Sequence, residues 1–164
     1  LNEEKICALE KDKAPIDCYC VGTELIVSAD APTCNLVYKL VEIDQQGMIR
    51  PRIKTSEKKA TMPYRKNVFR QITGGHFSRD LLYAVSERPQ EGADEIVSLL
   101  YKYVENGKVI KAQPNLSAIK KYASTQIAQL PDALSRIHEA DKSPVECSLH
   151  LLQAQRELEK EFRP

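Results

Sequence analysis

Residues Ala14 to Leu25 read Ala-Pro-Ile-Asp-Cys-Tyr-Cys-Val-Gly-Thr-Glu-Leu, and this stretch decides the fold prediction. Ile16 to Val21 is a short, mostly apolar run of the kind that buried strands show, and a turn at Gly22-Thr23 follows it. A strand that ends in glycine exposes backbone N–H groups that can point at an anion, and a threonine hydroxyl adds one donor. The residues alone therefore predict a turn, formed by Gly22 and Thr23, that suits a phosphate.

The segments around this stretch alternate between helical and extended patterns. Upstream, Ile6 and Leu9 share one face of a helix predicted from Asn2 to Leu9, which the charged turn Glu10 to Lys13 closes. Downstream, the pattern predicts three hairpins: Val37–Ile43 with Arg50–Lys54 around Asp44–Gly47, Val68–Ile72 with Leu81–Val85 around Thr73–His76, and Leu99–Val104 with Val109–Ala112 around Asn106-Gly107. The middle of the chain is therefore predicted to be antiparallel sheet.

After Pro114 the pattern changes to a helical period. Ser117 is predicted to cap a helix that reaches Leu130, and Asp132 to Ile137 gives a further short helical turn. Ser148 opens a final helix, whose inward-facing residues are predicted to be Leu149, Leu152, Leu158 and Phe162.

Composition excludes several classes of function. The 164 residues carry a formal net charge of +1, so the chain lacks the basic face that drives nucleic-acid binding. No run approaches the roughly 20 apolar residues that cross a bilayer, and the start lacks the apolar segment of a signal peptide. We therefore expect a cytoplasmic protein with neither nucleic-acid nor membrane partners. The first residue, Leu1, is not methionine, which suggests a processed or partial polypeptide.

The residues offer no catalytic or metal-binding set. The five cysteines, Cys7, Cys18, Cys20, Cys34 and Cys147, show no regular spacing, so we expect free thiols and no metal site. The three histidines, His76, His138 and His150, lie far apart in different settings, so none is predicted to be catalytic.

Several blocks of the chain resemble one enzyme family. Ala14–Leu25 is similar to the "APIDAFGVGTEL" stretch of nicotinate phosphoribosyltransferases, and Leu1–Ile6 resembles their "LDEYRI" segment. Further blocks that look like the family's follow in the family's order: Ser28–Pro32, Val37–Glu42, Lys54–Thr61 and Arg65–Arg70. The likeness covers residues 1 to 70 closely and continues in order, more loosely, from Leu99 onward.

The resemblance implies a fold and a function. The family has an irregular α/β barrel of the type II phosphoribosyltransferases joined to a sheet-rich domain. Residues 1–36 would be the last strand-helix unit of the barrel, and residues 37–164 the C-terminal domain with antiparallel hairpins and terminal helices, making this segment α+β. The complete enzyme would join nicotinate to phosphoribosyl pyrophosphate, using ATP and Mg²⁺, to form nicotinate mononucleotide for NAD biosynthesis, as a homodimer.

The carried-over roles are few. Gly22 and Thr23 match the turn that helps to hold the 5-phosphate of phosphoribosyl pyrophosphate, whereas the family's phosphohistidine lies upstream of the matched region. We therefore expect this segment alone to bind neither Mg²⁺ nor ATP and to be inactive. A non-catalytic assembly or regulatory domain derived from the family is the alternative.

Three positions depart from the family pattern. Cys20 and Tyr64 stand where the family has glycine, and Asn35-Leu36 replaces a small turn. A glycine position often has a backbone conformation that side chains resist, so strain or a crowded phosphate turn is expected at Cys20.

Overall fold

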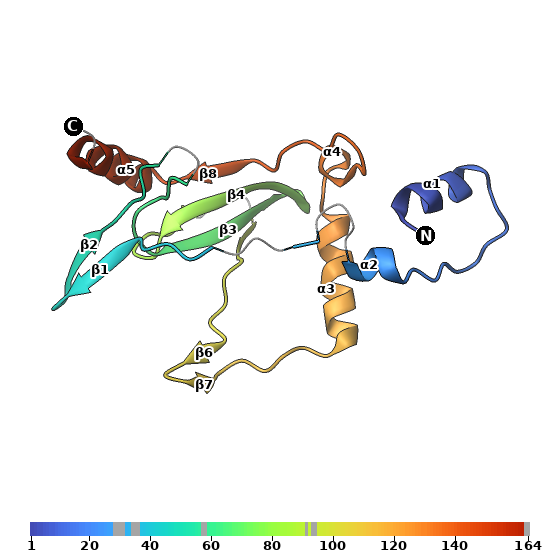
Figure 1. Cartoon of the computed structure of the whole chain (residues 1–164), viewed down its shortest axis with the longest axis horizontal. Coiled ribbons are helices and arrows are strands. Elements are labelled where there is room, and N and C mark those ends of the chain that lie inside the picture. The colour runs from blue at the N-terminus through green and yellow to red at the C-terminus, as the bar shows by residue number, and fades with distance from the viewer. Residues whose placement is uncertain (28–31, 34–36, 57–58, 91, 93–94, 163–164) are drawn as a thin grey trace. The chain divides into compact units, whose positions relative to one another are not determined.

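The computed structural model describes residues 1–27, 32–33, 37–56, 59–90, 92 and 95–162 (Figure 1). The chain divides into two compact units, each described here by itself. Unit 1 comprises Leu1–Tyr38 with Arg136–Glu139, and unit 2 comprises Lys39–Ser135 with Ala140–Pro164. That the first of these derives from a barrel stays a prediction.

The described residues of unit 1 form two helices. Helix α1, Glu3–Lys11, begins at Asn2, whose side chain accepts the Lys5 N–H at 3.2 Å. Asparagine is a preferred residue at this capping position, and Glu3 and Glu4 in the first turn oppose the positive end of the helix dipole. The predicted helix over Asn2–Leu9 is confirmed, although it continues through Lys11. Helix α2, Thr23–Val27, is a single short turn.

The strand predicted over Ile16–Val21 is wrong. These residues form neither helix nor strand, and most of them are exposed. A strand needs a neighbour to satisfy its backbone N–H and C=O groups, and no described strand pairs with this segment. Local bonds replace the ladder, such as the Ile16 N–H to the Ala14 carbonyl at 2.8 Å.

Unit 2 is built on a four-stranded sheet in the order β5-β3-β4-β8. Strands β3, Lys66–Thr73, and β4, His76–Ala84, form the predicted second hairpin and lie side by side in Figure 1. Gly74 and Gly75 close it with φ of +59° and +83°, the positive values that a two-residue hairpin turn requires. β5, Glu95–Ser98, pairs antiparallel with β3, and β8, Val145–Cys147, pairs parallel with β4. The sequence pattern predicted neither of these outer strands.

A bulge in the central hairpin decides which side chains share a face. Ile72 pairs with Phe77 but Gln71 pairs with Arg79, which leaves Ser78 as the extra residue. Beyond the bulge, Arg70 therefore lies opposite Asp80.

Two small hairpins complete the strands. β1, Glu42–Gln45, pairs with β2, Met48–Pro51, around Gln46-Gly47, with φ of +55° and +85°. This first hairpin is shorter than predicted, and its turn, Gln46-Gly47, is the second half of the predicted turn Asp44–Gly47, because β1 continues to Gln45. Asp44 accepts the Gly47 N–H at 2.8 Å from within β1.

The third hairpin has the turn that the sequence predicts. Asn106 and Gly107 have φ of +48° and +74°, and they join β6, Val104–Glu105, to β7, Lys108–Val109. The strands are two residues long, where the pattern predicted longer runs on each side.

Of the remaining helices, α3 and α4 precede β8 in the chain and α5 follows it. α3, Leu116–Ala128, is capped by Asn115, whose Oδ1 accepts the Ala118 N–H at 2.9 Å, so the predicted cap at Ser117 is wrong by two residues. α4, Asp132–Ser135, is the predicted short turn. α5, Leu149–Phe162, begins at Ser148 as predicted, with the Ser148 hydroxyl accepting the Leu151 N–H at 3.2 Å.

The core joins α5 to the central hairpin. Its buried apolar residues are Phe69, Ile72, Phe77, Leu81 and Ala84 of the sheet with Leu151, Ala154 and Leu158 of α5. Of the residues predicted to face inward, Leu158 is buried and Leu152 is half-buried, but Leu149 and Phe162 are exposed. The buried stripe of α5 is set by positions 151, 154 and 158 at helical spacing. Of the described helices, none has the length and apolar character that a bilayer crossing would need.

Candidate functional site

The predicted phosphate turn forms the entry to α2. The Gly22 carbonyl accepts the N–H groups of Leu25 and Ile26 at 3.1 and 3.2 Å, so Gly22 occupies the capping position and Thr23 begins the helix. Both residues are exposed. The first N–H groups of a helix have no acceptor within it, and because those of Leu25 and Ile26 bond to Gly22, the N–H groups of Thr23 and Glu24 are the ones that suit an external acceptor.

Glycine is not required here by the backbone. A Cβ added to Gly22 would meet no atom within 4 Å, and its φ is not in the left-handed range. Cys20 also has no positive φ, so the strain expected there is absent from the backbone. The nearby carboxylate of Glu24, exposed in the first turn of α2, opposes an anion. Any phosphate held at this turn therefore needs cationic groups from outside it.

Tyr64, the other departure at a family glycine, does adopt the left-handed conformation, with φ of +63°. Its ring stacks on His150 at 5.3 Å between centroids and 21° between planes. The Lys66 ammonium donates to the carbonyls of Tyr64 and Met62 at 2.6 and 2.8 Å, and burial lowers the lysine's pKa, which Glu42 partly counteracts. This turn is therefore held from two sides. Asn35-Leu36, the third departure, lies outside the described residues.

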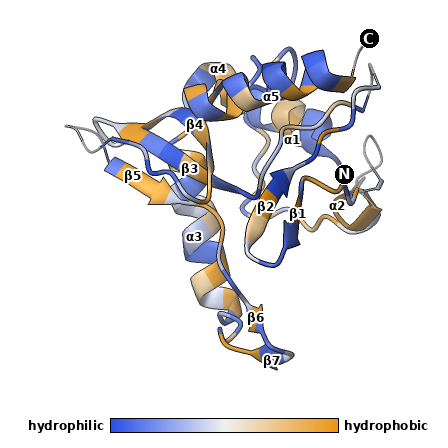
Figure 2. Cartoon of the chain, turned by 90° about the vertical axis from the view of Figure 1, so that its left-hand side faces the viewer, coloured by the Kyte–Doolittle hydropathy of each residue, from blue (hydrophilic) through white to orange (hydrophobic). Residues whose placement is uncertain are grey.

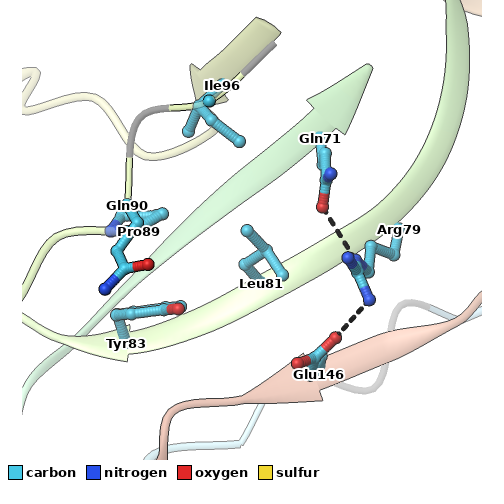
Figure 3. A pocket seen from close by; sticks show the side chains of 9 residues that line it. Gln71, Arg79, Leu81, Tyr83, Pro89, Gln90, Ile96 and Glu146 are labelled. Carbon is cyan, nitrogen blue, oxygen red and sulfur yellow. Dashed lines mark hydrogen bonds and ion pairs between the residues drawn. The ribbon is translucent and has the colours of Figure 1, made fainter. Parts of the chain in front are cut away.

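A small cavity lies on one face of the four-stranded sheet (Figure 3). It has a volume of about 220 Å³. Gln71 of β3, Arg79 and Tyr83 of β4, Ile96 of β5 and Glu146 of β8 line it, so all four strands contribute.

Arg79 is the centre of this cavity's polar wall. Its Nε donates to Gln71 Oε1 at 2.7 Å and its Nη1 to Glu146 Oε2 at 2.6 Å, as the dashed lines in Figure 3 show. The Arg79 and Glu146 side chains are 44% and 60% exposed, so solvent screens their attraction and the pair contributes little to stability. The wall holds a paired cation and no nucleophile with a base, so the cavity has no catalytic set.

A bidentate ion pair joins the two central strands. Arg70 binds Asp80 through Nε and Nη2 at 2.9 and 3.0 Å, with side chains 21% and 16% exposed. The Asp80 hydrogen bonds raise the pKa of Arg70. The guanidinium also lies 4.8 Å from the Phe77 ring centroid and donates to Gln126 of α3 at 3.2 Å. This arrangement links α3 to the sheet through one hydrogen bond and is structural.

The histidines and cysteines form no site in the described part of the chain. His76 is exposed beside the β3–β4 turn, His138 is exposed outside any helix, and His150 stacks on Tyr64. No three His, Cys, Asp or Glu side chains among the described residues are grouped to hold a metal ion. Cys7, Cys18, Cys20 and Cys147 are free thiols, and Cys34 lies outside the described residues.

The sequence pattern did not predict the cluster of Gln71, Arg79 and Glu146, because it depends on a bulge and on a strand that is distant in sequence. The Gly74-Gly75 turn alone would pair Gln71 with Ser78, and only the bulge moves Arg79 opposite Gln71. Glu146 could not be found because β8 was not predicted. The period-two spacing of Arg79, Leu81 and Tyr83 was the available signal.

Comparisons with known proteins agree on one family. Residues 93–155 match the family model described as "Nicotinate phosphoribosyltransferase C-terminal domain". Nicotinate phosphoribosyltransferase pncB2 of Mycobacterium tuberculosis is 36% identical over 145 residues, which cover 87% of this chain and 29% of that protein. The Bacillus subtilis nicotinate phosphoribosyltransferase is 29% identical over 170 residues, covering 90% of this chain and 35% of the relative.

A solved structure shares the fold. The crystal structure of human nicotinic acid phosphoribosyltransferase aligns with a TM-score of 0.60 and 21% sequence identity over 74% of this chain and 26% of that one. The fold and the sequence matches together define a segment of a phosphoribosyltransferase. The chain belongs to the nicotinate phosphoribosyltransferase family, and it corresponds to the C-terminal portion. It spans about a third of the length of these relatives.

Proposed function

We propose that this chain serves as the C-terminal portion of an enzyme that forms nicotinate mononucleotide from nicotinate and phosphoribosyl pyrophosphate, with hydrolysis of ATP, in NAD biosynthesis. The observation that carries the proposal is the 36% identity to a nicotinate phosphoribosyltransferase over 87% of the chain. A cytoplasmic homodimer is part of the same proposal for the complete enzyme.

In this proposal Gly22 and Thr23 contact the 5-phosphate of phosphoribosyl pyrophosphate. Three observations support the role: the turn is exposed, it begins a helix, and no side chain covers Gly22. A phosphate accepts hydrogen bonds from unpaired backbone N–H groups at such a turn. Mg²⁺ and ATP belong to the proposed reaction of the complete enzyme, and the proposal assigns neither of them to a residue of this chain.

The experiment replaces Gly22 in a longer, active polypeptide that contains this segment. Gly22→Asp sets a second carboxylate beside Glu24 where the donors meet the anion, and we expect the KM for phosphoribosyl pyrophosphate to rise at least about tenfold, ~1.4 kcal/mol of binding. Gly22→Ala is the matched control, because a Cβ there meets no atom within 4 Å. The KM for nicotinate should change far less in both variants.

Equal KM values for phosphoribosyl pyrophosphate in Gly22→Asp and the unmodified enzyme, at equal amounts of folded protein, would remove the phosphate role from this turn. The family assignment would stand in that case, because it rests on sequence identity and not on the turn.

A further inference from the structure

A larger groove lies within unit 2, between α3 and the segment that carries the β6–β7 hairpin. Its volume is about 650 Å³, within the roughly 300–1,000 Å³ of sites that hold small molecules. Tyr101, Tyr103 and Lys111 line it from the hairpin segment, and Ile119 and Tyr122 line it from α3. Figure 2 shows apolar colouring on both α3 and β6.

The aromatic rings of this groove are open to a ligand. Tyr101, Tyr103 and Tyr122 are 52%, 43% and 58% exposed, although each contributes to one concave surface. An exposed aromatic cluster in a hollow marks a binding surface more often than a stable surface of a monomer. Planar rings bind such side chains by stacking.

A single cation is positioned at these rings. The Lys111 ammonium lies 3.5 Å from the Tyr101 ring centroid and 5.2 Å from the Tyr103 centroid. Attraction between the ammonium and the ring faces holds the flexible lysine side chain in the groove. A cation held in place in this way loses less conformational freedom when an anion binds.

Charge in the groove favours an anion. Of the described residues that line it, Lys111 alone carries a charge. The nearby carboxylate of the hairpin, Glu105, is paired with Lys102 at 2.7 Å. The segment from Leu99 to Tyr122 also contains Lys108, Lys120 and Lys121 and no further carboxylate.

We propose that the groove between α3 and the β6–β7 segment binds a small ligand made of a planar aromatic ring and an anionic group. The ring stacks against the tyrosines, and the anion pairs with the Lys111 ammonium. Either a nucleotide or an aromatic carboxylate presents this chemistry. The proposal uses neither Gly22 nor Thr23, so it is independent of the proposed function.

The test compares matched ligands on the 164-residue chain. AMP and benzoate are each titrated beside their uncharged counterparts, adenosine and benzamide, and inorganic phosphate supplies an anion without a ring. Calorimetry gives the affinity, and amide chemical shifts locate the site. We expect at least one of the two anions to shift the signals of Tyr101, Tyr103 and Lys111, with its uncharged counterpart binding at least about tenfold more weakly and phosphate leaving those signals unmoved.

The anion that binds more tightly identifies the ligand class: AMP would indicate a nucleotide and benzoate an aromatic carboxylate. Equal binding of each anion and its uncharged counterpart would overturn the proposal, as would the absence of binding by both anions.

Variants locate the contacts. Lys111→Met keeps the aliphatic stem and removes the charge, and Tyr101→Leu removes a ring. Each should weaken binding of the tighter anion at least about tenfold, while Lys160→Met and Tyr38→Leu, at exposed positions that do not line the groove, should leave it unchanged. A well-dispersed amide spectrum confirms that each variant is folded.

Gly22→Asp separates this site from the phosphate turn. Unchanged binding in Gly22→Asp together with weakened binding in Lys111→Met supports the groove. Weakened binding in Gly22→Asp with unchanged binding in Lys111→Met would place the ligand at the Gly22 turn and overturn the proposal. The KM test of the proposed function is separate, because it uses a longer polypeptide and phosphoribosyl pyrophosphate.

Discussion

Tyr64 adopts the left-handed backbone conformation, which is unfavourable for a residue with a side chain. A side chain at a positive φ costs about 1–2 kcal/mol relative to glycine, and here φ is +63°. The stacked His150 ring and the Lys66 bonds to neighbouring carbonyls compensate for that cost. The glycine that the resemblance implies at this position would suit this backbone, and Tyr64 instead has the His150 ring as a partner.

The conformation makes a prediction about two substitutions at position 64. Tyr64→Gly and Tyr64→Ala both lose the ring, but only glycine relieves the backbone, so Tyr64→Gly should be more stable than Tyr64→Ala by about 1 kcal/mol. The urea midpoints of the two variants provide the measurement. Gly22 is the control, since its φ is not left-handed and Gly22→Ala should not destabilise the chain. An alanine variant at 64 that equals or exceeds the glycine variant would show that no strain is present.

At the scale of elements, the start of α3 rests on a single side chain. Asn115 Oδ1 accepts the Ala118 N–H, and no residue of the described α3 is buried, so the helix has little packing to replace a lost cap. Asn115→Ala should lower the free energy that protects the Ala118 amide from hydrogen exchange by about 1 kcal/mol.

Ser117 supplies the matched control for α3. It lies inside the helix, and Ser117→Ala should leave exchange equal or slower because alanine is the better helix former. If Ser117→Ala speeds exchange and Asn115→Ala does not, the helix begins where the sequence pattern predicted and not where the structure places it.

The elements that could be predicted from the sequence are those with local signals. Turn residues that tolerate positive φ indicate the hairpins at Gly74-Gly75 and Asn106-Gly107. The capping residues Asn2 and Ser148 mark the starts of α1 and α5. β5 and β8 were missed because their partners are distant in sequence, and Ile16–Val21 was predicted as a strand because an apolar run carries no information on whether a neighbour exists. The exposed turn at Gly22 and Thr23 was found, whereas the bulge that builds the Arg79 cluster has no local signature.

For the whole molecule, the described residues hold one exposed turn of the proposed site and no grouped catalytic side chains. Phosphoribosyl transfer requires several groups held together around the anomeric carbon and the departing pyrophosphate, in a site closed to water. We therefore predict that the isolated 164-residue chain forms no nicotinate mononucleotide from nicotinate, phosphoribosyl pyrophosphate, ATP and Mg²⁺.

Chromatography of the reaction mixture against a control without protein measures this. Product that disappears when Gly22 is changed would contradict the prediction. A catalytic group would then have to be sought among His76, His138 and His150.

The parallel pairing of β8 with β4 sets the order in which this chain can assemble. The β3–β4 hairpin closes across two residues, but Asp80 meets Val145 only after residues 81–144 have been made. Closing a longer loop costs more entropy, so the local hairpin forms first and β8 with α5 joins late. During synthesis, the Asp80–Leu82 edge of β4 therefore stays unpaired until residues 145–147 emerge from the ribosome, and an unpaired strand edge is a template for pairing with another chain.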